Sequence, residues 1–135
     1  MSRQLFINLP VRDLSKATAF YTAIGASMNP QFSDDTSSCM VLSDTLFVML
    51  MTHEKWARFT NKPIVDSRRE SEVMLALSAD DRESVDKLTD IACAHGGKAD
   101  VNARQDLGFM YGRSFEDPDG HIWEVMFVDM SRIEG

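Results

Sequence analysis

Residues 115–125 read FEDPDGHIWEV, and this stretch decides the fold. The Asp-Pro-Asp-Gly segment at 117–120 is typical of a turn, because proline fixes one backbone angle and glycine adopts conformations that other residues avoid. The apolar and aromatic runs on either side, 109–115 and 121–128, are typical of strands. The stretch therefore predicts a β-hairpin.

A second copy of this hairpin lies earlier in the chain, where residues 43–48, SDTLFV, match residues 119–124, DGHIWE. Each copy closes a series in which one strand is followed by a helix and then by three strands. Apolar residues at helical spacing mark both helices, and glycine follows each of them. This order predicts an internal repeat. The two series are strands 4–9, 26–32, 38–42 and 46–51 with helix 14–24, and strands 72–78, 98–101, 109–115 and 121–128 with helix 84–95.

The repeat predicts an α+β fold with eight strands, in which each unit has the order βαβββ. Repeat one covers residues 1–52 and repeat two covers residues 71–128, and a more polar linker at 53–70 joins them. Because 135 residues is close to the common size of one domain, residues 1–130 are expected to form a single domain. Residues 131–135 are expected to be a tail.

The composition is that of an ordinary globular protein, with 44% hydrophobic and 26% charged residues. A net charge of -7 disfavours nucleic acid and anionic membranes as partners, because like charges repel. No apolar run is long enough for a membrane-spanning helix, and no signal peptide is visible. The two cysteines, Cys39 and Cys93, are far apart and suit free thiols in a reducing compartment. We therefore expect a cytoplasmic protein.

Three segments carry a resemblance to a known family. Residues 6–14, FINLPVRDL, with Phe20-Tyr21 and Gly25 are similar to its opening strand and helix, and His95-Gly96-Gly97 is similar to the end of its second helix. Residues 115–125 are similar to its closing hairpin. The chain thus resembles the vicinal oxygen chelate superfamily of glyoxalases, bleomycin-resistance proteins and extradiol dioxygenases. The resemblance implies a curved, incomplete barrel of two βαβββ units around a cavity, with the helices outside.

The resemblance also implies metal-ligand positions on the first and fourth strand of each unit. In unit one these positions fall on Phe6 and Val48, whose side chains cannot bind a metal. In unit two the first-strand position falls on Glu72 or Val73, and the fourth-strand position falls on Glu124. Since divalent metals usually have three or more protein ligands, we expect no cofactor. A divalent metal held by Glu124 and Glu72 is the alternative.

Glu124 is the most informative residue, because it lies in an apolar run, 122–128, where an unpaired carboxylate is costly. One interpretation is a metal ligand or a general base that faces the cavity. The other is an ion pair. If 117–120 is a four-residue loop, the hairpin register places Arg113 opposite Glu124, and this pairing is the favoured prediction.

The remaining candidates are residues that could contact a ligand. Most of the nine methionines fall in predicted strands, where thioethers either line an adaptable cavity or fill the core, and the core is favoured. Aromatic residues of the strands are candidates for a pocket wall, with two polar residues beside them. The predicted ligand-binding residues are Phe6, Asn8, Phe47, Tyr111, Arg113 and Trp123, with Glu124 as the candidate catalytic residue.

Two functions follow from these observations. The first is a glyoxalase-like or bleomycin-resistance-like protein that encloses a small, partly apolar molecule without a complete metal site. The second is a metal-dependent enzyme similar to lactoylglutathione lyase, which acts on a small carbonyl compound or thioether adduct. Half-barrels leave open sheet edges, and edges are normally paired or covered. Together with the family resemblance, this predicts a homodimer.

Overall fold

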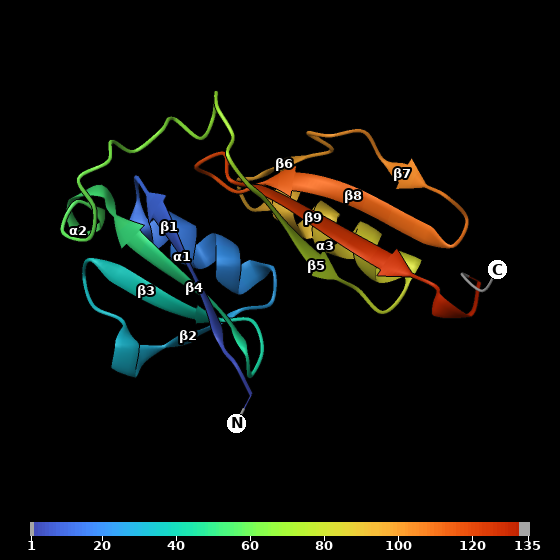
Figure 1. The fold of residues 1–135 in the computed structure, drawn as a ribbon, viewed down its shortest axis with the longest axis horizontal. Coiled ribbons are helices and arrows are strands. Elements are labelled where there is room, and N and C mark those ends of the chain that lie inside the picture. Colours follow the sequence, from blue (N-terminus) through green and yellow to red (C-terminus); the bar gives the residue numbers. More distant parts are fainter. Residues whose placement is uncertain (1, 133–135) are drawn as a thin grey trace. The chain divides into compact units, whose positions relative to one another are not determined.

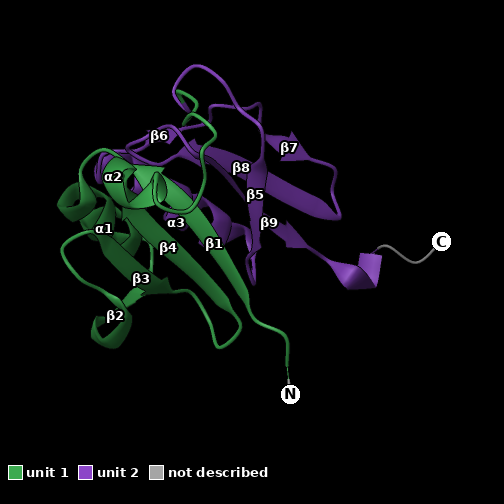
Figure 2. Ribbon diagram, turned by 60° about the vertical axis from the view of Figure 1, so that its left-hand side comes forward, with its two compact units in different colours: residues 1–66 green, residues 67–135 purple. Residues whose placement is uncertain are grey.

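The computed structural model describes residues 2–132, and the chain divides into two compact units at residues 66 and 67. Each unit contains one mixed β-sheet, and a long helix covers one face of that sheet (Figures 1 and 2). The fold is therefore α+β with two sheets, as the sequence predicts. The expected tail at 131–135 is described only to Arg132, which ends a short 3-10 helix, η2 (Met130–Arg132); residues 133–135 lie outside the described part.

The first unit contains a four-stranded sheet in the order β1-β4-β3-β2. The first and last strands, β1 and β4, pair in parallel, and the other neighbours are antiparallel. The expected strand at 26–32 is shorter than predicted, because Pro30 begins a 3-10 helix. The elements are β1 (Leu5–Val11), α1 (Leu14–Ala23), β2 (Ser27–Asn29), η1 (Pro30–Phe32), β3 (Ser37–Val41), β4 (Leu46–Thr52) and α2 (His53–Trp56).

Helix α1 forms where the sequence predicts it. The Asp13 side chain accepts a hydrogen bond from the Lys16 backbone N–H and caps the first turn, and Gly25 follows the helix at a φ of +111°. The buried face of α1 packs on β3 and β4, and the Oγ1 of Thr18 lies 2.8 Å from the Oγ of Ser38 on β3. The core of this unit is almost inaccessible to solvent and contains Val11, Ala17, Phe20, Tyr21, Met40, Val48 and Leu50.

The second unit repeats this plan around α3, which Asp81 caps by accepting from the Ser84 backbone N–H. Its strands follow the order β5-β9-β8-β6, and a further short strand, β7, also pairs with β8. Strands β5 and β9 are parallel, like β1 and β4. The elements are β5 (Met74–Ser78), α3 (Arg82–Ala94), β6 (Lys98–Ala99), β7 (Gln105–Asp106), β8 (Met110–Glu116) and β9 (Ile122–Val128).

The described residues form nine strands, whereas the sequence predicts eight. The difference lies at the expected strand 98–101. Asp100 has a φ of +55°, which an extended strand does not allow, so β6 ends at Ala99. The chain then turns and returns to β8 as β7. The second sheet thus has five strands instead of four.

Strand β1 lies at one edge of the first sheet and β2 at the other, and β5 and β6 lie at the two edges of the second sheet. Such an edge is the feature from which the homodimer was expected, and that assembly stays a prediction. Among residues 2–132, no helix is both long and apolar enough to cross a membrane.

Candidate functional site

Each sheet has one face covered by its helix and one open face, and strand alternation assigns every side chain to one of them. In the second unit, Arg113 identifies the covered face, because it bonds to carboxylates of α3. Its partner on β9 is Val125, which is fully buried. Two other predicted ligand-binding residues share this face: Tyr111 donates a hydrogen bond to Asp86 of α3, and Trp123 is 1% exposed.

Glu124 consequently lies on the open face of the second sheet. It pairs with Ser114 on β8 and with Ala76 on β5. The predicted pairing with Arg113 is wrong by one residue, and a one-residue shift places the two side chains on opposite faces. The predicted ion pair with Arg113 therefore does not explain the carboxylate of Glu124 in this apolar strand.

The turn between β8 and β9 explains the register. It has five residues instead of four, because Glu116 pairs directly with Ile122. The Asp117 carboxylate accepts hydrogen bonds of 2.9 Å from the backbone N–H groups of Asp119 and His121, which stabilises the longer loop. Gly120, at a φ of +93°, completes it. The sequence motif thus identifies the turn but not its length.

Arg113 has acidic partners on the covered face. Its Nε and Nη2 donate to the two carboxylate oxygens of Asp100 at 3.0 and 2.9 Å, and Nη1 lies 3.1 Å from Asp86 and 3.5 Å from Asp90. Only 5% of the Arg113 side chain is exposed. The hydrogen bond from Arg113 lowers the pKa of Asp100, and the hydrogen bond from Tyr111, followed by that from Arg113, lowers the pKa of Asp86. This cluster holds the sheet to its helix.

The surroundings of Glu124 are apolar and partly enclosed. Met74, Met110 and Met126 lie on the same open face, since they alternate in step with Glu124 or its partners. Asn102 bounds these surroundings on one side. Its backbone N–H donates to the Ser114 hydroxyl at 2.8 Å, and its side-chain Nδ2 lies 3.5 Å from the Met74 sulfur. Ser114 is on β8 and Met74 is on β5, and β9 lies between these two strands. Asn102 therefore spans β9 beside Glu124.

Glu124 is half-buried, and no other side chain within residues 67–132 forms a hydrogen bond or ion pair with it. A partly buried carboxylate without a partner is unfavourable, and such groups are typical of functional positions. The sequence does not identify Ala76 or Asn102 as neighbours of Glu124. The parallel register of β5 and β9 and the fold of the loop after Asp100 bring them there.

The open face of the first sheet carries the other three predicted ligand-binding residues. Phe6 and Phe47 are direct partners on β1 and β4, and their rings stack with centroids 4.6 Å apart. Phe6 remains 50% exposed, and Asn8 lies next to it on the same face, opposite Met49. Val48, the position expected from the family pattern, is fully buried on the covered face instead. Its open-face neighbours are Phe47 and Met49, which do not supply an oxygen or nitrogen ligand.

The donor set does not fit the divalent metal that the family resemblance implies. Glu72 lies before the start of β5 and is exposed, and the residue of β5 that pairs with Glu124 is Ala76, which offers no ligand atom. Across residues 2–132, no three His, Cys, Asp or Glu side chains come together in a way that could hold a metal. Glu124 alone remains of the expected ligands on the open face.

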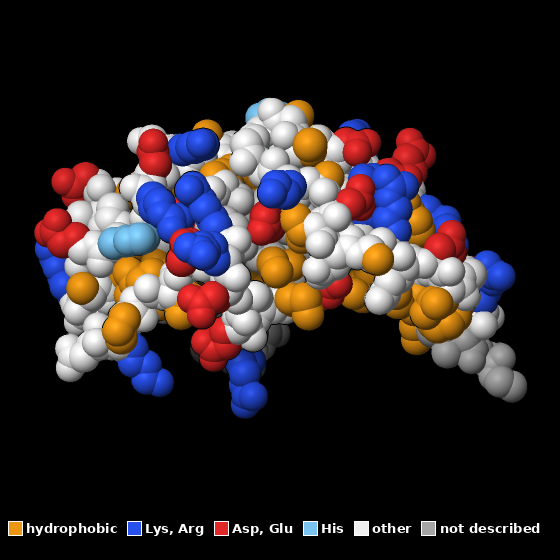
Figure 3. All heavy atoms as spheres, turned by 90° about the horizontal axis from the view of Figure 1, so that it is seen from above, with side chains coloured by type: hydrophobic (Ala, Val, Ile, Leu, Met, Phe, Trp, Pro, Cys, Tyr) orange, Lys and Arg blue, Asp and Glu red, His pale blue; other side chains and the backbone are white. Residues whose placement is uncertain are grey.

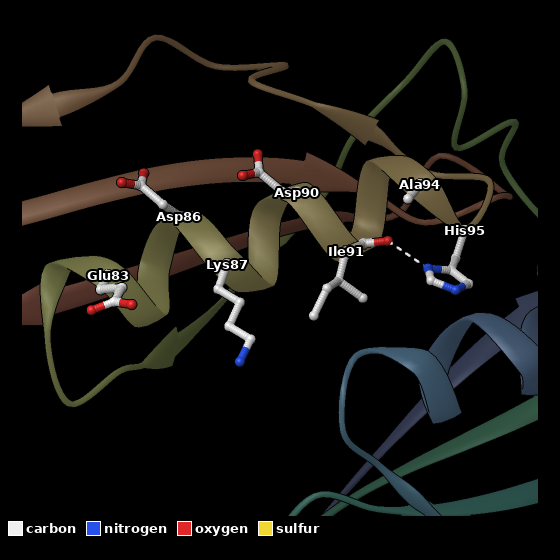
Figure 4. Close-up of a pocket in the computed structure, with 7 residues that line it drawn as sticks. All are labelled: Glu83, Asp86, Lys87, Asp90, Ile91, Ala94 and His95. Carbon is white, nitrogen blue, oxygen red and sulfur yellow. Dashed lines mark hydrogen bonds between the residues drawn. The ribbon is translucent and has the colours of Figure 1, made fainter.

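A shallow depression also runs along α3 (Figure 4). Two of its acidic residues, Asp86 and Asp90, are partners of Arg113, and the ring Nδ1 of His95 lies 2.8 Å from the Ile91 carbonyl oxygen. On the face shown in Figure 3, acidic and basic side chains are interspersed with small apolar patches. These features are typical of a solvated surface. The lining residues are Glu83, Asp86, Lys87, Asp90, Ile91, Ala94 and His95.

Comparison with known proteins is consistent with this fold. The model of the Glyoxalase/Bleomycin resistance protein/Dioxygenase superfamily matches residues 3–125. A hypothetical protein from S. aureus is 27% identical with a TM-score of 0.78, over 94% of this chain and 95% of that one. A genomically encoded fosfomycin resistance protein from Listeria monocytogenes is 26% identical with a TM-score of 0.66, over 94% and 91%.

A third solved structure, a glyoxalase-related enzyme from Fulvimarina pelagi, is similar in fold. It is 22% identical, with a TM-score of 0.75 over 94% of this chain and 88% of that one. No curated protein matches the sequence.

Proposed function

Because the chain belongs to the glyoxalase/bleomycin resistance protein/dioxygenase superfamily, we propose that it binds a small, partly apolar molecule on the open faces of its sheets, without a resident metal. The observation that carries this proposal is the exposed aromatic pair on the first sheet. A half-exposed phenylalanine stacked on a second ring is costly in water, and apolar ligands gain most at such positions. Asn8 supplies a polar group beside the pair.

Replacing Phe6 with alanine tests this proposal. A neutral dye that fluoresces in apolar surroundings, such as Nile red, is expected to bind the parent. Loss of one stacking ring, about 0.5–1.5 kcal/mol, raises the dissociation constant roughly two- to twelvefold. Phe32 is a matched control, because it belongs to the same unit, is 65% exposed and lies on η1. Equal weakening by Phe6→Ala and Phe32→Ala would mean that the dye does not bind at the open face.

The rival function is the metal-dependent lyase, in which Glu124 would hold a divalent ion. The lyase function is supported by Glu124, which lies on the open face of the second sheet and has no partner within its unit. Against it stands the donor set. Ala76 pairs with Glu124 on the second sheet, and Phe47 and Met49 flank Val48 on the first sheet, and none of them offers an oxygen or nitrogen ligand. A single carboxylate provides too few ligands for a stable zinc, nickel or manganese site.

Elemental analysis separates the two functions. The purified protein is expected to contain no stoichiometric zinc, nickel or manganese, and Glu124→Gln is expected to be unchanged in metal content. The variant should also keep the parent's free energy of unfolding to within about 0.5 kcal/mol, because no partner in its unit is lost. Stoichiometric metal that disappears in Glu124→Gln would establish the enzyme function instead.

A further inference from the structure

We propose that the open face of the second sheet binds an organic cation, an ammonium or amidinium group on an apolar body, whose charge the Glu124 carboxylate receives. This inference rests on the proposed function and names the class of ligand for the open face of one of the two sheets. Its first support is charge. Within residues 67–132, Glu124 has no counter-charge, whereas Glu116 on the same face lies directly opposite Lys98 on β6.

Three arginines of this unit are held by other acids. Arg113 is on the covered face with Asp86, Asp90 and Asp100. Arg82 forms an ion pair of 2.7 Å with Asp106, and Arg104 lies 3.3 Å from Asp100. These three arginines are thus paired with other acids, whereas Glu124 lies on an apolar face without a cation from its own unit. A ligand cation completes that arrangement.

The surroundings of Glu124 fit the apolar body of such a ligand. Met74 is 56% exposed, and Met126 lies two residues from Glu124 along the same face of β9. Thioethers are flexible and make favourable contacts with the edges of aromatic rings. Ala76 beside the carboxylate has only a methyl side chain, and it is exposed, so a ligand group can approach there. The Asn102 amide and Met74 bound this space on one side.

Other ligand charges fit less well. An anion would face Glu124 on a protein whose net charge is already -7. A divalent metal would lack further ligands, as described above. A neutral apolar molecule would leave the carboxylate desolvated without compensation. A monovalent organic cation satisfies the carboxylate with charge-assisted hydrogen bonds and buries its apolar part against the methionines.

Methyl NMR of protein labelled at the methionine methyl groups tests the inference at the site itself. Two probes of the same shape are compared at pH 7: 2-phenylethylamine, which is a cation, and 2-phenylethanol, which is neutral. Both are expected to shift the Met74 and Met126 signals and to leave Met28, in the other unit, unchanged. The amine is expected to bind about tenfold more tightly, as one charge-assisted contact predicts.

Two matched variants assign the effect to one carboxylate. Glu124→Gln is expected to remove the tenfold preference while changing the affinity for the alcohol less than about twofold. Glu116→Gln, which removes a carboxylate from the same face, is expected to keep the preference. Equal affinities for both probes, or a preference that survives in Glu124→Gln, would overturn the inference and leave the proposed function standing.

Two further outcomes are decisive. If neither probe shifts Met74 or Met126, this face does not bind small apolar molecules, and the proposed function fails for it together with the inference. If zinc chloride alone shifts Met126 at micromolar concentration and displaces the amine, the carboxylate is a metal ligand, and the inference is overturned.

Discussion

Replacing Arg113 with alanine is expected to lower the free energy of unfolding by about 3 kcal/mol, the lower end of the range for breaking a buried ion pair. The guanidinium is 5% exposed and bonds to Asp86, Asp90 and Asp100, so its removal leaves three carboxylates close together. The cost stays at the lower end because these carboxylates are partly exposed and can be hydrated, with side-chain exposures of 47%, 73% and 32%. Urea denaturation followed by the fluorescence of the two tryptophans, Trp56 and Trp123, measures it.

Arg104→Ala is the control for this prediction. Arg104 also contacts Asp100, at 3.3 Å, but 56% of its side chain is exposed, so its removal should cost less than about 1 kcal/mol. Equal losses in the two variants would show that burial of Arg113 is unimportant.

The stabilising effect of Arg113 should also depend on pH. The pKa values of Asp86 and Asp100 are lower in the folded protein than their ordinary value of 3.8. The stability that these two carboxylates contribute is therefore present above pH 3.8 and is lost as the pH falls through their lowered pKa values. The difference in stability between the parent and Arg113→Ala should therefore shrink below pH 3.8.

Gly120→Ala is expected to destabilise the protein by an amount on the order of 3 kcal/mol, because strain and a steric clash add. Gly120 has a φ of +93°, and an added Cβ would lie 2.7 Å from the Cα of Arg68 and from the carbonyl oxygen of Ser67. These two residues hold the hairpin turn: the Ser67 hydroxyl donates to the Asp119 carbonyl at 2.6 Å, and Arg68 donates to the Pro118 carbonyl at 3.1 Å. The substitution therefore forces backbone to move.

Comparison with Gly25→Ala separates the backbone strain at Gly120 from the steric clash there. Gly25 has a similar φ of +111°, but an added Cβ would meet no atom within 4 Å. Its substitution should cost about 1–2 kcal/mol, which is the strain alone. Gly120→Ala should exceed it by at least about 1 kcal/mol in the same urea titrations. If the two variants are equally stable, the close approach of Ser67 and Arg68 contributes nothing.

The sequence predicts the elements well because their signals are local. Asp13 and Asp81 cap the two long helices, Gly25 ends the first, and the repeated strand order identifies the two units. The break at Asp100 was not predicted, because a single residue in a left-handed conformation leaves no pattern in the surrounding sequence.

The candidate site is less predictable, because side-chain placement depends on register. One extra residue in the turn after Asp117 moves Arg113 to the face opposite Glu124. The stacking of Phe6 on Phe47 depends on the pairing of β1 with β4, and the role of these two residues in binding stays a prediction. Asn102 belongs to a loop and contacts Ser114 on the same face as Glu124. Alternation along a strand cannot predict the position of a loop residue.

The parallel pairs β1–β4 and β5–β9 have a consequence for how the chain acquires its structure. In each unit the first strand to be synthesised has as its neighbour the last, so it must wait for the intervening helix and strands. Closing such a long loop is entropically costly, and chains dominated by distant pairings fold slowly. Strands β1 and β5 are thus the segments left unpaired longest in a growing chain. Leu5 and Phe6 at the start of β1, Met74 at the start of β5 and Val73 just before it are apolar and exposed even in the final structure. These segments are therefore the expected contacts for a chaperone.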